Sequence, residues 1–304
     1  MDRRVKLIFN PHADNGHGWR IASSLQATIE HLGGAEWAGT KYPTHATELA
    51  QEAAQDGFEI VVAIGGDGTV HEVINGLMQV SSEVRPMLAA VPIGNGNDFC
   101  ANVGLESDPA VAILRAFSGE PRGLDIGMVR DGSGRTEYWD NSLGIGFDAA
   151  TVIHSHTITR LQGTPMYFVA AVKTILRDQH APHFKIRTDT EEIDNKFLWV
   201  AFLNGRREGG GFILAPEARP DDGVLDYTMV ERVSRPMMFR LIPEFMRGTH
   251  GRFKEVHIGR FRELELEADH ALLIHTDGEI FANATDNVRE LTVQVLPEAI
   301  RLIA

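Results

Sequence analysis

Cysteine and long hydrophobic runs are nearly absent from this sequence of 304 residues. Cys100 is the only cysteine, which excludes an intrachain disulfide and a cysteine-cluster zinc site and fits a reducing cytoplasm. We expect its thiol to be buried and inert. No apolar stretch approaches the length of a membrane span, and the N-terminal one is too short for a signal peptide. We therefore expect a soluble cytoplasmic protein with no transmembrane segment, whose contact with lipid is peripheral.

Positive charge is also scarce. Lysine and arginine together number 29, against 42 aspartates and glutamates, so the formal net charge is −13. A chain of this charge is poorly suited to binding nucleic acid by bulk neutralisation of phosphates. The hydrophobic content of 43% is sufficient for globular cores, and the length exceeds that of a usual single domain. Two domains are therefore expected.

Several common site motifs are missing. The glycine-rich loops of the chain fit neither the P-loop pattern GxxxxGKS/T nor the dinucleotide pattern GxGxxG, so both of those folds fail on spacing. There is no HExxH, and His154 and His156 are only two residues apart, which makes a zinc site improbable. The remaining histidines are scattered, and we expect surface or packing roles for them.

What the sequence does contain is a strand, a glycine loop and a helix within residues 59–78. The apolar run Ile60–Ile64 leads into Gly65, Gly66, Asp67, Gly68 and Thr69, and an amphipathic stretch follows. Such a loop offers backbone N–H groups at a helix N-terminus, which suits phosphate. A carboxylate beside phosphates repels them unless a cation lies between. The loop therefore indicates a metal-bound nucleotide.

Strands and helices alternate over the first part of the chain. Strands are predicted at 4–10, 36–40, 60–64, 87–92 and 124–129, and helices at 19–32, 48–55 (with Thr47 as N-cap) and 109–117. This pattern predicts an α/β domain over residues 1–130 with a mostly parallel sheet. Ligands of such sheets bind beyond the carboxyl ends of the strands, where both glycine-rich loops fall. The second of these loops contains Gly94, Asn95, Asn97 and Asp98.

After residue 130 the pattern changes. The turn-rich segment 131–137 is a plausible boundary, and residues 131–304 are predicted to form a mainly antiparallel, β-rich second domain. Short strands are expected at 184–188, 197–203, 224–230, 255–258, 263–266, 272–275 and 291–296, with one long helix at 165–177. An alternative is that the last strand or the tail returns to the first domain.

Residues 232–262 reverse the charge of the chain. Eight arginines and lysines oppose only Glu244 and Glu255, with methionine and phenylalanine interleaved. One interpretation is a surface for anionic lipid headgroups. The other is an ordinary helix with solvated arginines and its apolar residues packed on the second domain, and this one is slightly preferred.

The motifs taken together resemble those of the diacylglycerol kinase catalytic-domain superfamily, which includes bacterial diacylglycerol kinases, related lipid kinases and sphingosine kinases. The resemblance rests on GGDGT at 65–69, HEVINGL at 71–77 and PIGNGNDF at 92–99. NAD kinases share GGDGT, but the NDF loop at this distance is more specific. The match extends over essentially the whole chain, through Asn10-Pro11, Thr40, 124–127, NSLGIGFD at 141–148, 209–226 and 275–279.

The resemblance implies a site for ATP and Mg²⁺. Gly66, Gly68 and Thr69 would hold phosphate, with Asn10 and Thr40 as further nucleotide contacts, although Thr40 is equally well explained as an ordinary strand-end threonine. Asp67, Asp98 and Asp125 each end or follow a strand, and converging there they would hold Mg²⁺ directly or through water.

In the second domain the resemblance implies Glu279 as general base and Asp277 as a supporting carboxylate. The alternative for Asp277-Gly278 is a plain hairpin turn. It also implies a structural cation held by the Asp222 carboxylate and the backbone oxygens of Arg219 and Val224, where the alternative is again an Asp-Gly turn.

Two cationic phosphate partners of the family are missing. Asp14 and His17 occupy the region after Asn10-Pro11, where the family has a basic side chain, and Arg20 is the available substitute. No arginine follows NDF, where the sequence continues Cys100-Ala101-Asn102. These departures indicate weakened or altered nucleotide binding.

The preferred hypothesis is an ATP- and Mg²⁺-dependent lipid kinase that phosphorylates a hydroxyl of diacylglycerol or a similar lipid at the inner face of a membrane. The alternatives are an NAD kinase-like enzyme, a nucleotide- or lipid-binding protein with little kinase activity, and a kinase for a soluble polyol or a sphingoid base. No nucleic-acid partner is expected, and the sequence is compatible with a homodimer.

Overall fold

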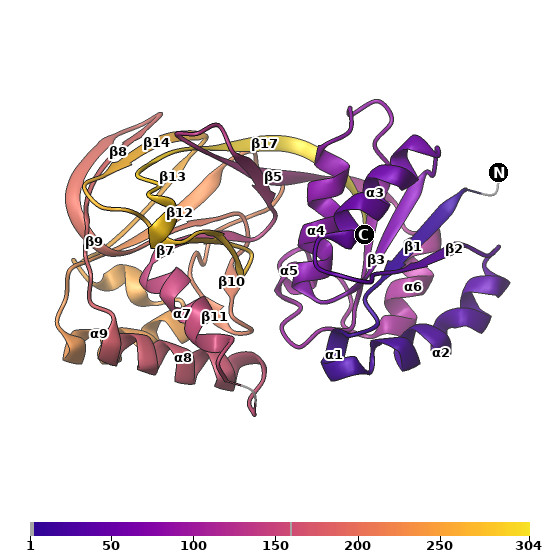
Figure 1. Cartoon of the computed structure of the whole chain (residues 1–304), viewed down its shortest axis with the longest axis horizontal. Helices are drawn as coiled ribbons and strands as arrows, with labels where there is room; N and C mark the ends of the chain where they lie inside the picture. Colours follow the sequence, from indigo (N-terminus) through magenta and orange to yellow (C-terminus); the bar gives the residue numbers. More distant parts are fainter. Residues whose placement is uncertain (1–2, 159) are drawn as a thin grey trace. The chain divides into compact units, whose positions relative to one another are not determined.

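The computed structural model describes residues 3–158 and 160–304 (Figure 1). The chain divides into two compact units. The first unit runs to Ile126 and also contains Pro297–Ala304, and the second unit is Gly127–Leu296. Within the described residues, none of the helices has both the length and the apolar character needed to cross a bilayer.

The first unit alternates strands and helices. Its strands are β1 (Val5–Phe9), β2 (Glu36–Gly39), β3 (Ile60–Gly65), β4 (Met87–Pro92), the first part of β5 (Pro121–Asp131) and the end of β17 (Glu290–Ile303). Its helices are α1 (Ala13–Gly16), α2 (Gly18–His31), α3 (His45–Gln55), α4 (Asp67–Met78), α5 (Asp98–Asn102) and α6 (Pro109–Ser118).

The sheet of the first unit is parallel. Its strand order is β2-β1-β3-β4, and β17 joins β4 in parallel through Leu302 and Leu88. Helices α2 and α6 pack on one face and α3 and α4 on the other. Strands β1, β3 and β4 are buried over their whole length, which explains their uninterrupted apolar sequences. The predicted α/β domain with a mostly parallel sheet is confirmed.

The predicted cap of the second helix is wrong. Helix α3 begins at His45 with Thr44 as its N-cap, so Thr47 lies inside the helix. The Thr47 hydroxyl donates to the carbonyl oxygen of Glu72 in α4, at 2.9 Å, and the Glu72 carboxylate in turn accepts from the N–H groups of Thr44 and Ala46. A partner from a neighbouring helix therefore replaces the local cap.

The second unit is mainly antiparallel, as predicted. Its further strands are β6 (Thr136–Trp139), β7 (Ser142–Gly146), β8 (His183–Thr188), β9 (Glu192–Leu203), β10 (Arg207–Glu208), β11 (Phe212–Ile213), β12 (Leu225–Glu231), β13 (Val256–Phe261), β14 (Glu263–Ala268), β15 (Ile274–Thr276) and β16 (Glu279–Ala282). Its helices are α7 (Phe147–Ser155), α8 (Gly163–Arg177) and α9 (Arg235–Arg247), with 3₁₀ turns η1 (His250–Arg252) and η2 (Ala284–Asp286).

The long strand β9 organises the second unit. It pairs with β8 along its first half and with β7 and β12 along its second half, and β15 and β16 extend the sheet beyond β7. Helix α7 packs on α8, and α8 packs on α9, along one side of this unit (Figure 1). An aromatic and aliphatic core fills the sheet interior, with Trp139, Phe197 and Phe202 fully buried.

The turn-rich segment after residue 130 forms a hairpin. The Asp131 carboxylate accepts hydrogen bonds from the N–H groups of Ser133 and Arg135, both from within the turn that joins β5 to β6. The change from the first compact unit to the second lies earlier, between Ile126 and Gly127 within β5. The C-terminal segment from Pro297 belongs to the first unit.

Candidate active site

Four strand ends of the first unit meet at one edge of its sheet. Asn10 follows β1, Thr40 follows β2, Gly66 follows β3 and Ile93 follows β4. Backbone hydrogen bonds continue the sheet to this point, from Asn10 N–H to the Ile64 oxygen at 3.0 Å and from Ile93 N–H to the Gly65 oxygen at 2.9 Å. Because the strands are parallel, their carboxyl ends bring the predicted nucleotide residues together.

The two glycine loops touch through their backbones. A Cβ atom on Gly94 would overlap the Cα atom of Gly66, and one on Gly66 would come within 3.2 Å of the Gly94 Cα. A Cβ atom on Gly65 would overlap the side chain of Thr69. Glycine is therefore required at these positions because of close approach, whether or not a ligand is bound.

Asp67 and Asp98 both approach Gly96. The Asp67 Oδ1 atom accepts a hydrogen bond from the N–H of Phe99 at 3.0 Å, which joins the start of α4 to the second loop. The position of a Cβ atom on Gly96 is 2.9 Å from Asp67 Oδ2 and 3.8 Å from Asp98 Oδ2, so both carboxylates approach the same point. Two carboxylates beside amide groups at a helix N-terminus are a donor set that suits Mg²⁺ bound to phosphate.

Asn97 holds the shape of the second loop. Its backbone is left-handed, with φ of 52°. Its side chain accepts from Gly94 N–H at 3.0 Å and donates to the Gly94 oxygen at 2.8 Å. Asn95 is exposed at the tip of the same loop. Asn97 therefore shapes the loop through its own contacts, whereas Asn95 faces solvent.

Asn10 and Thr69 are brought together below the loop. Thr69 is buried, and its hydroxyl accepts a hydrogen bond from the Asn10 side-chain amide at 3.4 Å. The Asn10 side-chain oxygen accepts from the N–H of His12 at 2.9 Å. A Cβ atom on Gly18 would overlap the Asn10 oxygen, so α2 starts against this residue. The exposed Arg20 of the first turn of α2 is thereby carried to the same edge of the sheet.

Asp125 has a different neighbour from the other two predicted metal ligands. It is buried within β5, and its Oδ1 atom accepts a hydrogen bond from the N–H of Glu298 at 2.8 Å. Glu298 has a left-handed backbone, with φ of 47°. Among the described residues, the three aspartates do not form a group with oxygens within 4.8 Å of one another. The contact observed for Asp125 ties the C-terminal strand to β5.

The predicted catalytic pair of the second unit lies on the β15–β16 hairpin. Asp277 and Gly278 both have positive φ, at 50° and 87°, as a two-residue type I′ turn requires. The Asp277 carboxylate accepts hydrogen bonds from the N–H groups of residues 140, 141 and 142 at 2.9–3.0 Å. Asp277 thus anchors the segment that enters β7. Glu279 is exposed, and no hydrogen bond or ion pair of its side chain is found within the described part of the chain.

Residues 219–224 form a turn in which Asp222 Oδ1 accepts from the N–H of Val224 at 3.3 Å. Gly223 is left-handed, with φ of 73°, and the Arg219 side chain bonds to Asp221. The predicted cation at Asp222 and at the carbonyl oxygens of Arg219 and Val224 remains a prediction.

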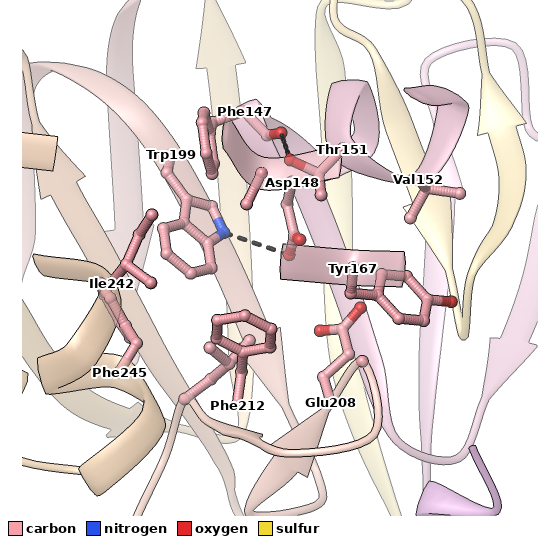
Figure 2. Close-up of a pocket in the computed structure, with 13 residues that line it drawn as sticks. Phe147, Asp148, Thr151, Val152, Tyr167, Trp199, Glu208, Phe212, Ile242 and Phe245 are labelled. Carbon is pink, nitrogen blue, oxygen red and sulfur yellow. Dashed lines mark hydrogen bonds between the residues drawn. The ribbon is translucent and has the colours of Figure 1, made fainter. Parts of the chain in front are cut away.

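An apolar pocket lies in the second unit (Figure 2). Three helices and the β9–β11 region contribute its walls, which include Phe147, Thr151, Val152, Tyr167, Ala171, Trp199, Phe212, Leu214, Ile242 and Phe245. Aromatic rings surround it, and the rings of Trp199 and Phe245 are tilted by 44° with their centroids 4.6 Å apart. A lining of this kind is typical of a site for an apolar small molecule.

Two carboxylates interrupt this apolar lining. Asp148, at the start of α7, accepts a hydrogen bond from the Trp199 indole N–H at 3.1 Å, and Glu208 belongs to β10 (Figure 2). The fully buried His275 lies behind them, with Nε2 at 3.3 Å from Asp148 and 3.5 Å from Glu208. A Cβ atom on Gly144 would overlap both His275 and Asp148. These three groups form the polar end of the pocket, and their ligand atoms lie within 4.8 Å of one another.

The charge of His275 is set by opposing effects. Burial lowers its pKa, but the carboxylates of Glu208 and Asp148 outweigh this and raise the pKa of His275 to about 9. Its Nδ1 atom accepts a hydrogen bond from Gly278 N–H at 3.2 Å, which only an unprotonated Nδ1 can do. Protonation of Nδ1 breaks that bond, which opposes the rise in the pKa of His275.

This polar cluster was not predicted from the sequence. The histidines were assigned packing or surface roles, and no contact among residues 141–148, 209–226 and 275–279 was predicted. The available signal was Gly144, because a glycine between the apolar residues Leu143 and Ile145 indicates a close approach of another group.

Two family models match this chain. The model of the diacylglycerol kinase catalytic domain matches residues 4–129, and the model of the YegS C-terminal NAD kinase beta sandwich-like domain matches residues 141–304. The chain belongs to the family of diacylglycerol kinases and YegS-like lipid kinases. The resemblance seen in the sequence is confirmed, and the protein is a phosphotransferase with an alcohol group as acceptor.

Relatives match over most of their length. The protein named "Probable lipid kinase YegS-like" of Chromohalobacter salexigens is 32% identical over 283 residues, covering 88% of each chain. The diacylglycerol kinase of Mycobacterium tuberculosis is 27% identical over 278 residues, covering 91% of this chain and 88% of its own. A solved diacylglycerol kinase from Bacillus anthracis shares the fold with a TM-score of 0.73 at 20% identity, covering 99% of this chain and 96% of its own. Yeast NADH kinase matches more distantly, with a TM-score of 0.55 at 11% identity, covering 99% and 83%.

Proposed function

We propose that this protein transfers the γ-phosphoryl group of ATP, bound with Mg²⁺, to a hydroxyl of diacylglycerol or a similar lipid. The observation that carries the proposal is the apolar pocket of the second unit with its polar end at Asp148, Glu208 and His275, in a chain of a lipid kinase family. A soluble nucleoside acceptor is polar and is poorly matched to a pocket whose walls are almost entirely apolar.

The first unit supplies the nucleotide side. Amide groups at the start of α4 and the two glycine loops suit the phosphates, and Asp67 and Asp98 are the residues that would hold Mg²⁺. When bound, Mg²⁺ neutralises charge on the phosphates during transfer. Asn10 and Thr40, at the neighbouring strand ends, are assigned to the nucleotide, and Arg20 is the available cation where the family has a different basic residue.

The second unit supplies the acceptor side. The apolar chain of the lipid occupies the aromatic pocket, and Asp148 and Glu208 accept hydrogen bonds from the polar group of the lipid. In the transfer step the acceptor oxygen bonds to the γ-phosphorus, the bond from that phosphorus to the bridging oxygen of ADP breaks, and Glu279 takes the hydroxyl proton. Asp277 holds the hairpin that carries Glu279, through its three backbone hydrogen bonds.

The test is phosphorylation of defined acceptors by the purified full chain. The protein is incubated with γ-labelled ATP, Mg²⁺ and mixed micelles containing diacylglycerol, monoacylglycerol or a sphingoid base, beside a reaction containing NAD. We expect label in a glycerolipid. We also expect Asp67→Asn and Glu279→Gln each to lower turnover by about 10²- to 10⁴-fold, with unfolding midpoints close to that of the unmodified protein because Asn keeps the acceptor for Phe99.

Other outcomes of this assay contradict the proposal in different ways. Formation of NADP with unlabelled lipid would establish the NAD kinase alternative. Tight ATP binding with no labelled acceptor, under conditions in which a verified lipid kinase is active, would establish a binding protein without turnover. Labelling of the sphingoid base alone would keep the reaction and replace the acceptor.

A further inference from the structure

Helices α8 and α9 carry an unusual share of the exposed apolar side chains. Five of the twelve large hydrophobic residues that are exposed in the described chain lie on these two helices: Phe168, Val169 and Leu176 on α8, and Phe239 and Met246 on α9. Single exposed apolar residues are ordinary, but a concentration of them on adjoining helices marks an interaction surface.

The spacing places these residues on one outward stripe of each helix. On α9 the exposed apolar residues are Pro236, Phe239, Pro243 and Met246, at intervals of three and four, and the buried Met238, Leu241 and Phe245 repeat on the opposite side. On α8 the exposed Phe168 and Leu176 lie two turns apart, opposite the buried Ala170, Ala171 and Thr174. Each helix is therefore apolar on both its inner and its outer side.

The two outward stripes point away from the same pocket. Tyr167 and Ala171 on the inner side of α8, and Ile242 and Phe245 on the inner side of α9, line the proposed acceptor pocket. The Arg235 guanidinium joins the helices by donating to the carbonyl oxygens of Ile175 and Leu176, at 3.1 and 3.0 Å. We call this paired outer surface the α8–α9 face.

The charge of the two helices is opposite to that of the chain. Lys173, Arg177, Arg235, Arg240 and Arg247 are their basic residues, and Glu244 is their one acidic residue. Glu244 is buried and bonds to Thr249 and Arg252, so it does not reach the outer surface. The α8–α9 face is therefore apolar and basic in a chain whose net charge is −13.

We propose that the α8–α9 face docks on an anionic lipid bilayer, so that the acceptor lipid enters the pocket beneath the two helices from the membrane. The inference rests on the proposed lipid kinase function. Apolar side chains of an interfacial helix insert at the headgroup boundary, and arginines beside them pair with anionic headgroups. Charge favours a bilayer over a symmetric dimer formed through this face, because two copies of a basic face would repel each other.

The test measures binding separately from catalysis. The full chain, without ATP, is sedimented with vesicles of phosphatidylcholine alone or mixed with phosphatidylglycerol. We expect binding to the anionic vesicles and little to the neutral ones. Phe239→Ser with Met246→Ser, and Arg240→Glu with Arg247→Glu, are each expected to weaken binding by at least about tenfold.

Matched controls come from the first unit. Leu114→Ser removes a similarly exposed apolar side chain, 46% exposed on α6, and Arg301→Glu reverses an exposed arginine on β17. Neither is expected to change vesicle binding. The α8–α9 variants are expected to keep full activity on a short-chain acceptor that is monomeric in water, because the pocket lies on the inner side of the helices.

Three results would overturn the docking proposal. They are equal binding to neutral and anionic vesicles, binding that the α8–α9 substitutions leave unchanged, and a dimer that dissociates on those substitutions while no vesicle is bound. None of these results touches the kinase activity, and absence of activity on every acceptor with intact vesicle binding would instead contradict the proposed function alone.

Discussion

The two binding regions of this protein are built in different ways. The nucleotide loops of the first unit take most of their residues from two short stretches, 65–69 and 94–98. The pocket of the second unit takes its residues from α7, α8, β9, β10, β11 and α9, and its polar end also uses β15. The first region is formed mainly by the backbone of two loops. The second is formed by side chains that come from a sheet and three helices.

This difference explains why the first region can be predicted from the sequence and the second cannot. Where two backbones touch, as at Gly66 and Gly94, only glycine avoids overlap, and the requirement leaves a contiguous motif. Many apolar residues can form the wall of an apolar pocket. Nothing in the sequence therefore distinguishes Ile242 or Phe212 from a residue of the hydrophobic core.

The largest effect is expected where backbone shape is broken. In Gly65→Ala the new methyl group overlaps the Thr69 side chain, so the loop has to move and nucleotide binding should fall by at least about tenfold, with a loss of about 1–3 kcal/mol in the free energy of unfolding. Calorimetric titration with ATP and Mg²⁺, and denaturant unfolding, measure the two effects.

Gly132→Ala is the matched control, because its nearest neighbour is a Glu290 oxygen at 3.4 Å. It should leave both quantities nearly unchanged. If Gly65→Ala binds ATP normally, the first region tolerates changes of backbone shape and the contrast with the pocket disappears.

The next effect concerns the pocket alone. Ala171, on the inner side of α8, lines the pocket, and Ala171→Trp fills part of it. We expect KM for the lipid acceptor to rise by about tenfold or more while KM for ATP is unchanged, because the nucleotide residues lie in the first unit. Ala110→Trp, at an exposed position of α6, is the control. A parallel rise in KM for ATP would show that the two regions are not independent.

The last effect concerns stability and not binding: the free energy of unfolding is expected to depend on pH through a histidine of the second unit. His250 is fully buried, its ring stacks on Phe245 with centroids 4.1 Å apart, and burial lowers the pKa of His250 to about 4. The unfolded chain then binds a proton more readily than the folded one, so this contribution to stability is present above pH 6.5 and is lost as the pH falls toward 4.

Between pH 7 and pH 4.5 we expect the unfavourable protonation of His250 to lower the free energy of unfolding by about 2 kcal/mol. Denaturant unfolding of the protein and of His250→Phe at both pH values separates the contribution of His250 from that of the other titrating groups. An equal loss in the variant would show that His250 is not the group responsible.

Much of the secondary structure was predictable, and the exceptions share a cause. The predicted helices at 19–32, 109–117 and 165–177 agree closely with α2, α6 and α8. Helix α7 was missed, although residues 147–155 begin directly after a glycine, because the second domain was predicted to be nearly all strand. Thr47 was placed as a cap because a local rule was applied where Glu72 of another helix supplies the partner.

The same cause divides the candidate sites. The hairpin turn at Asp277-Gly278 was one of the two interpretations considered, and the geometry shows that Asp277 anchors residues 140–142. Asp277 holds the hairpin that carries Glu279 by bonding to Asn141, which lies 136 residues earlier in the chain. No local sequence pattern predicts a contact between residues so far apart.

The sequence by itself determined the α/β first domain, the β-rich second domain, the paired glycine loops and the family, because each depends on local periodicity or on backbone positions that only glycine can occupy. Tertiary structure alone decided that Asp67 and Asp98 both approach Gly96, that Asp125 bonds to the C-terminal strand, and that Asp148, Glu208 and His275 end one pocket. Those groups lie on separate elements, and their meeting depends on packing and strand pairing rather than on neighbours in the chain.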